Sequence, residues 1–361
     1  MRLRRGPGSR GPIGRWLTTG AMIGGVLAGV VAPGATDAPV AAAEVAGLSA
    51  AALAPLDHNN RAAVRDSYNS VLVPAAATPV GWTGNVAGCV PGAPSTAAQD
   101  ATLTTINWYR NMAGLPPVRF EAVRSAKAQG AALMLEANHA ISHDPPPTWL
   151  CYNAPGVEAL RNSNVSIGTA GSRAISGFMV DAGRGLEAAG HRRWVLFPNA
   201  TTMGSGITSK STAIWVIDAF GARPPSAPEW SPWPTAGYFP AQLEPAGRWS
   251  LSHADADFTN ATVTVQRGGT VLPVTKEAVV RNIGDDTLVW QVAPGFTLRG
   301  PDQDYLVSVS GVLLGRDPTP VSFRYTVRLF DVNVDKPTAP GKPVGAPGLQ
   351  SATVSWARRC V

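Results

Sequence analysis

Hydrophobic residues repeat at helical spacing in the first third of the chain. Between Leu103 and Met112 they fall mostly three or four positions apart. Ser95 or Thr96 supplies a side-chain oxygen that can cap a helix at its start, and Gly114 follows as a stop signal. The pattern therefore predicts a capped amphipathic helix that ends just before this glycine.

Two more helices and two strands are predicted in the stretch that follows. Residues 120–139 place small and apolar residues at helical spacing, and this helix should end near Asn138. Residues 172–183 predict a third, shorter helix. Residues 203–209 and 211–221 predict two strands joined by a polar turn. The second strand is apolar on both faces, as in a central strand covered by helices.

The pattern changes after residue 222. Residues 223–248 are rich in proline and tryptophan and predict a stiff linker. From residue 249 to residue 333, short alternating runs separated by turn residues predict an all-β sandwich domain. Residues 334–361 resemble the first two strands of a fibronectin type III module. Because a complete module is much longer, this truncated tail should not form a core of its own.

Composition and the N-terminus indicate a folded, exported protein. Hydrophobic residues make up 45% of the 361 residues and charged residues 15%, which is enough apolar material for a packed core. Residues 1–43 combine five arginines, an apolar run broken by glycines and the small residues of "VAAAE". They predict a signal peptide cleaved after Ala43 and a secreted or cell-envelope location. An uncleaved N-terminal anchor is the alternative, and no later stretch predicts a membrane span.

The net charge does not favour a nucleic-acid partner. The whole chain carries +6, but residues 1–43 hold five arginines and Asp37, which contribute +4. Removal of this segment leaves +6 − 4 = +2 on the mature chain. No basic stripe remains, so we expect no binding to nucleic acid.

Three cysteines are present, and an exported protein favours pairing two of them. Cys89 and Cys151 form the plausible disulfide, which leaves Cys360 near the end of the sequence. Closing a loop of this length should stabilise the fold by roughly 4 kcal/mol.

Six short motifs follow one another between residues 90 and 222. They are "INWYRNMAGLPPV", "ISHDPPPTWLCY", "GVEAL", "GFMVDAG", "GHRRWVL" and "MGSGI…IWVIDAFG". In this order they resemble the CAP superfamily, which includes cysteine-rich secretory proteins, antigen 5 and plant pathogenesis-related proteins. The chain looks most like the secreted bacterial branch with an appended β-sandwich. The resemblance implies a three-layer α-β-α sandwich with a cleft over the sheet.

The resemblance also implies a site in which two histidines and two acids meet in that cleft. His143 matches the first histidine, and Glu158 in "GVEAL" matches the glutamate of a Gly-Glu-Asn signature. His191 in "GHRRW" matches the second histidine. Asp181 stands where the pattern has a glutamate, and its side chain is one methylene shorter.

Such a set of side chains could bind a divalent cation. His143, Glu158 and His191 offer imidazole nitrogen and carboxylate oxygen, which suit Zn²⁺ or a similar ion. Water held by such an ion would be a hydrolytic nucleophile. Without metal, the acids could orient the imidazoles through hydrogen bonds. Taken alone, His143 is more typical of a structural histidine than of a functional one, and Arg192 with Arg193 predicts a solvated pair beside Trp194.

Three functions remain open from the sequence. The first, which we favour, is a secreted binding protein whose cleft takes a lipid, a glycan or a peptide. The second is a metal-assisted hydrolase that acts on peptide or cell-envelope substrates. The third is a structural envelope protein with a vestigial site. A nucleophilic enzyme has little support, because no G-x-S-x-G motif is present.

The expected fold class is α+β. A three-layer CAP-like sandwich is followed by an all-β sandwich and a truncated fibronectin-like tail. In chain order, the predicted parts are a signal peptide at 1–43, an N-terminal extension at 44–88, a CAP-like domain at 89–222, a linker at 223–248, a β-sandwich domain at 249–333 and a tail at 334–361.

Overall fold

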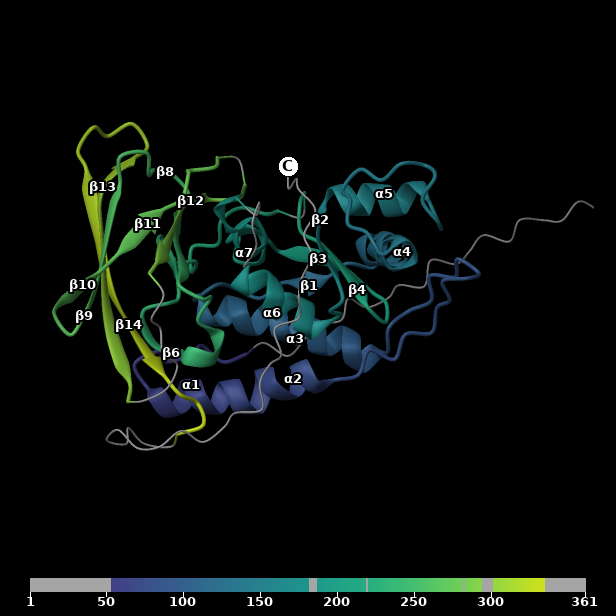
Figure 1. Cartoon of the computed structure of the whole chain (residues 1–361), viewed down its shortest axis with the longest axis horizontal. Coiled ribbons are helices and arrows are strands. Elements are labelled where there is room, and N and C mark those ends of the chain that lie inside the picture. Colours follow the sequence, from purple (N-terminus) through teal and green to yellow (C-terminus); the bar gives the residue numbers. More distant parts are fainter. Residues whose placement is uncertain (1–52, 182–186, 219, 282, 294–300, 335–361) are drawn as a thin grey trace, which may run out of the picture. The chain divides into compact units, whose positions relative to one another are not determined.

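The computed structural model describes residues 53–181, 187–218, 220–281, 283–293 and 301–334 (Figure 1). All of them belong to one compact unit, Val45–Val361. The predicted signal peptide with its cleavage site, nearly all of the fibronectin-like tail, and Cys360 lie outside the described residues. Among the residues that are described, no helix is both long and apolar enough to cross a membrane.

A four-stranded mixed sheet forms the centre of the first half. Its strands lie in the order β1 (Arg119–Phe120), β3 (Thr202–Ile207), β4 (Ser211–Trp215) and β2 (Ser163–Ile167). β1 pairs with β3 in parallel, whereas the other neighbours are antiparallel. The two strands predicted from sequence are β3 and β4, and β4 is internal and buried along its whole length, as predicted.

Helices cover both faces of this sheet. One face carries α3 (Thr96–Met112) and α6 (Ser172–Val180), and the other carries α4 (Ala122–Asn138) and α5 (Ala154–Arg161) (Figure 1). Successive residues of β4 point to opposite faces of the sheet. Ala213 packs with α4 and α5, whereas Ile214 belongs to the core that contains α3 and α6. The three-layer α-β-α arrangement is therefore present.

Start and stop signals placed the first two long helices correctly. The Ser95 hydroxyl accepts the backbone N–H of Ala98 at 3.1 Å, so Ser95 caps α3. α4 ends at Asn138, and His139 follows in a left-handed conformation (φ 48°). α5 and β2 were not predicted from the sequence, because both are short and carry few strongly apolar residues.

The N-terminal extension is a packed part of this unit. It forms α1 (Arg61–Ser67), a π-helical turn η1 (Tyr68–Leu72) and α2 (Val73–Ala77). The indole N–H of Trp108 in α3 donates to the Ser67 hydroxyl at 2.9 Å. Arg61 pairs with Asp302 at 3.0 Å. The extension therefore contacts both the helices and the strands that follow later in the chain.

The second half is largely β and contains two sheets. One sheet has the order β10-β9-β13-β14-β6, with β8 paired to β13, and the other has the order β11-β12-β7-β5. The bounds are β5 (Ser231–Trp233), β6 (Gly237–Pro240), η3 (Ala241–Leu243), β7 (Arg248–His253), β8 (Ala256–Asp257), β9 (Thr262–Arg267), β10 (Thr270–Leu272), β11 (Val274–Lys276), β12 (Asp286–Val292), β13 (Gln303–Leu314) and β14 (Val321–Phe330).

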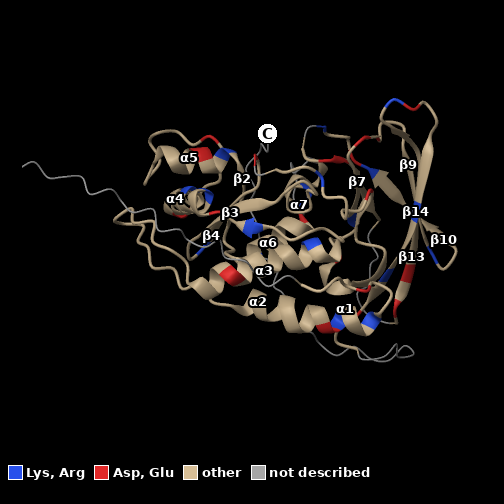
Figure 2. Ribbon diagram, turned by 180° about the vertical axis from the view of Figure 1, so that it is seen from behind, with Lys and Arg blue, Asp and Glu red and all other residues tan. Residues whose placement is uncertain are grey.

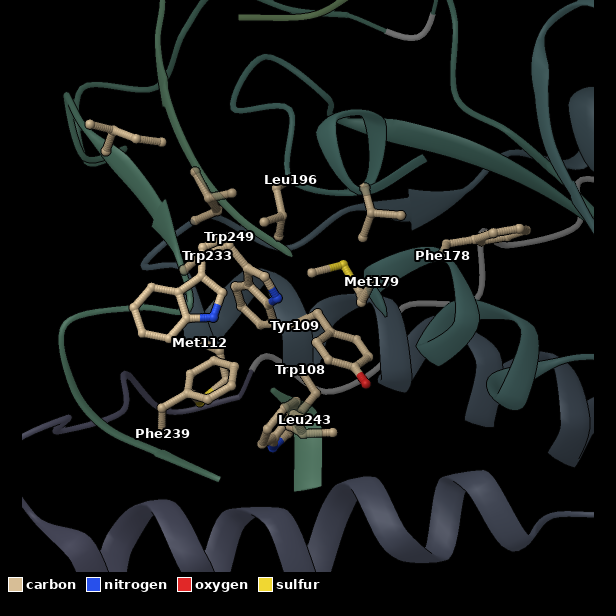
Figure 3. Packing of buried hydrophobic residues seen from close by; sticks show 14 of the residues in the cluster. Trp108, Tyr109, Met112, Phe178, Met179, Leu196, Trp233, Phe239, Leu243 and Trp249 are labelled. Carbon is tan, nitrogen blue, oxygen red and sulfur yellow. The ribbon is translucent and has the colours of Figure 1, made fainter. Parts of the chain in front are cut away.

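The predicted linker at 223–248 is not a separate connecting segment, because β5 and β6 lie within it and belong to the two sheets. Its tryptophan Trp233 is only 1% exposed and packs edge-on against Tyr109 of α3 at 5.8 Å between ring centroids. Figure 3 shows these rings in one cluster with Trp249 of β7. Burying such large rings stabilises the fold, whereas a free linker would leave them exposed to water. This segment is therefore part of the core.

Candidate functional site

A buried aspartate–histidine pair joins α6 to α7 (Gly190–Val195). The ring Nδ1 of His191 lies 3.0 Å from Oδ1 of Asp181, and the backbone N–H of His191 donates to Oδ2 at 3.1 Å. The side chains are 2% and 0% exposed. Phe178 stacks on the imidazole with centroids 5.1 Å apart. Two of the four predicted site residues are thus together, beneath the surface.

Charges around this pair keep Asp181 ionised. Burial by itself raises the pKa of this carboxyl, but the attraction of His191, Arg192 and Arg248 outweighs it and holds the pKa below its usual value. Burial lowers the pKa of Arg192 to about 10, so its guanidinium remains charged at neutral pH. The site therefore holds a carboxylate stabilised by buried cations.

The arginines beside His191 are buried, so the prediction of a solvated pair was wrong. Arg192 and Arg193 are 1% and 5% exposed. Arg192 donates to the carbonyls of Met179, Val180 and Arg248 and to the Ser250 hydroxyl. Backbone carbonyls that are buried at the end of α6 need donors, and the guanidinium supplies several at once.

His143 follows α4 and is half-buried. Its Nδ1 lies 2.5 Å from the carbonyl oxygen of Leu160, so this nitrogen carries the proton and donates. The contact fixes the ring against the last turn of α5. An ordered imidazole with one nitrogen engaged leaves the other nitrogen as the acceptor.

Glu158 lies on the exposed side of α5 and forms an ion pair that sequence reasoning did not include. Lys127 of α4 contacts its two carboxylate oxygens at 2.8 and 2.7 Å. The same ammonium lies 5.6 Å from the ring of Trp215. Lys127 could have been suspected only from its position on the outer side of α4, which is a weak signal.

The segment from α5 into β2 connects these parts. Leu160 holds His143 and Glu158 holds Lys127, while the Asn164 amide donates to the backbone carbonyl of His191 at 3.0 Å. His143 and His191 thus both contact the seven-residue segment 158–164, and Glu158 belongs to it. We call the half-exposed part of this region, formed by Lys127, His143 and Glu158, the α5–β2 corner.

The donor set as arranged does not fit a metal ion. Across the described ranges of the chain, no group of three or more His, Cys, Asp and Glu residues lies close enough to hold one. Each predicted ligand has a different partner, since Nδ1 of His191 contacts Asp181 and Glu158 contacts Lys127. The predicted ligand set of His143, Glu158 and His191 is thus divided among separate contacts. Zinc coordination needs such donors on one centre.

Comparison with protein families identifies the part of the chain that contains this site. Residues 103–218 match the family model of CAP, the cysteine-rich secretory protein family. These residues form a CAP domain. A comparison with curated proteins found no match.

All four predicted site residues lie within the matched part of the CAP domain. The predicted disulfide is present as well, with the Cα atoms of Cys89 and Cys151 5.1 Å apart. It ties the segment before α3 to the loop that enters α5. The CAP domain is thus covalently closed on the side where α5 begins.

Proposed function

We propose that this chain is an exported CAP-domain protein that binds an extracellular lipid, glycan or peptide at the α5–β2 corner. Export is supported by the arginine-rich, apolar N-terminal sequence and by the disulfide, which persists in oxidising compartments. The CAP match adds to this, because its family description is that of secretory proteins.

The observation that carries the binding proposal is the exposed ion pair beside an ordered histidine. Lys127 in α4 and Glu158 in α5 remain 30% and 50% exposed, and the half-buried His143 is held by the last turn of α5. Together they offer a cation, an anion and an imidazole to a polar ligand. Trp215 below the ammonium provides an apolar base.

Binding is favoured over hydrolysis by the state of the second histidine. His191 is 2% exposed, and its Nδ1 faces a carboxylate that is itself fully buried. A general base must come within hydrogen-bond reach of a substrate proton. The buried pair instead ties the end of α6 to the first turn of α7, which is a positioning role.

The test compares binding by matched variants of the mature chain. Thermal shift and NMR titration would be run with a short-chain phospholipid, a cell-wall oligosaccharide and a peptide mixture. We expect one class to bind, and Glu158→Gln or His143→Ala to weaken that binding about tenfold, which corresponds to loss of one charge-assisted contact.

Asp304→Asn is the control, because Asp304 is 51% exposed and pairs with Arg328 as Glu158 pairs with Lys127. It should leave binding unchanged. Equal effects of the two acid substitutions, or turnover of the ligand that requires His143, would contradict the proposal.

A further inference from the structure

Three strongly exposed apolar side chains are the direct neighbours of the disulfide. Val90 follows Cys89 and is 50% exposed, while Leu150 and Tyr152 flank Cys151 and are 62% and 40% exposed. The disulfide holds the Cα atoms of the two cysteines 5.1 Å apart, so the residues next to them lie in one region of the surface. We call them the disulfide tip.

The stretches of sequence that contain the tip carry no charged residues. Residues 78–99 and 145–157 contain no Asp, Glu, Lys or Arg. Figure 2 shows the stretch before α3 and the turn that enters α5 without charged residues, whereas charges appear on α5 itself. Arg161 lies within electrostatic range of Tyr152, but it pairs with Asp144 at 2.5 Å, so the two charges cancel. A patch that is apolar at its centre and carries no net charge nearby does not favour a charged partner.

The backbone at the tip is fixed in an unusual conformation. Cys89 and Cys151 have φ values of 51° and 59°, in the left-handed region that most residues avoid. The Trp82 indole N–H donates to the Pro91 carbonyl at 2.7 Å, and Trp149 packs partly against the α4–α5 core. The exposed side chains are therefore held outward on an ordered base.

We propose that the disulfide tip docks the protein on an uncharged lipid surface, with Leu150, Val90 and Tyr152 entering the interface. A stable protein interface buries about 800 Å² per partner, which three side chains on loops do not provide. A bilayer accepts single apolar side chains, and tyrosine is favoured at the boundary between lipid and water. Aliphatic valine and leucine also argue against glycan stacking, which uses flat rings.

This surface is distinct from the α5–β2 corner, so the two proposals can fail independently. The tip lies at the start of α5, whereas His143 contacts the end of that helix. Because the tip has no basic residue, docking should depend neither on anionic lipid nor on ionic strength.

The experiment is flotation of the mature chain with phosphatidylcholine vesicles. We expect the wild-type chain to float with the vesicles, and Leu150→Asp to lower partitioning about tenfold, since one apolar side chain is lost from the interface. Val90→Asp is the second variant. Val271→Asp is the matched control, because Val271 is 60% exposed but lies on β10 in the β region.

Each outcome decides the proposal. Reduced flotation by both tip variants with native melting temperatures, and none by the control, supports it. Absence of wild-type flotation overturns it, as does equal loss in the Val271→Asp control. Binding only to anionic vesicles that high salt abolishes would also overturn it. So would tip variants that fold and float like wild type, or that lose binding only to a glycan or a protein.

Discussion

The guanidinium of Arg192 in α7 donates to the backbone carbonyl of Arg248 in β7 at 3.0 Å. It also reaches the Ser250 hydroxyl at 3.1 Å while holding the end of α6. Next to it, Arg193 donates to the carbonyls of Val280 and Asp285. Two consecutive buried arginines of the CAP domain thus bind the backbone of the β region.

Arg192→Met should destabilise the whole described unit by about 3–5 kcal/mol. Methionine keeps much of the volume but leaves several buried carbonyls without donors and removes one of the cations near Asp181. Urea denaturation would measure the loss. Arg324→Met, at an exposed position in β14, should change the free energy of unfolding by less than about 0.5 kcal/mol. Equal losses in both variants would contradict this role.

Gly206 sets the distance between α4 and the CAP sheet. A Cβ added there would lie 2.0 Å from the carbonyl oxygen of Ala128, far inside the van der Waals contact distance of two non-bonded heavy atoms. Gly206→Ala should therefore push α4 off β3 and cost at least about 1–3 kcal/mol. Gly177 in α6 has nothing within 4 Å of an added Cβ, so Gly177→Ala should stabilise by about 0.5–1 kcal/mol. Thermal unfolding should show a lowered melting temperature for Gly206→Ala and a raised one for Gly177→Ala.

The close approach at Gly206 also marks a limit of sequence reasoning. Periodicity and capping residues were enough to place α3, α4, α6, β3 and β4, because these signals are local. The neighbouring residues in the sequence do not show whether a glycine lies under a closely packed helix or in a turn. The same limit applies to Trp233, whose surroundings predicted a linker although its ring belongs to the core.

The candidate site was partly predictable for a similar reason. The resemblance placed Asp181 and His191 in one site, although Asp181 stands where the family has a glutamate, and the structure joins the two side chains. The contacts of Glu158 depend on how α4 and α5 pack, so its partner Lys127 carried no sequence signal. Burial of Arg192 was also hidden, since charged residues are expected at the surface unless their partners are known.

Metal removal should have no effect on stability. The predicted metal ligands are divided among contacts with Lys127, Leu160 and Asp181. An ion that bound the folded state would raise the melting temperature with its concentration. We expect the same melting temperature in excess chelator and in excess Zn²⁺, and no stoichiometric metal by elemental analysis. A chelator-dependent drop that His143→Ala abolishes would restore the metal hypothesis.

Asp181 should make the free energy of unfolding fall at low pH, and Asp181→Asn should remove this part of the pH dependence. Its folded-state pKa lies below the ordinary value of 3.8, because attraction to His191, Arg192 and Arg248 outweighs the burial that would raise it. A lowered pKa means that the folded state favours the ionised carboxylate. The stabilisation is therefore complete above about pH 4 and is lost as the pH falls through the folded-state pKa.

At neutral pH, Asp181→Asn should lower the free energy of unfolding by about 3 kcal/mol, because buried cations lose their counter-charge. The difference from wild type should shrink as the pH falls below about 4, where the wild-type carboxyl also becomes neutral. Chemical denaturation across this range would measure it. Asp317→Asn is the control: its pKa is also lowered, by hydrogen bonds from Thr319, but the side chain is exposed and solvent screens it. A difference at Asp181 that stays constant with pH would show that the carboxylate charge does not stabilise the CAP domain.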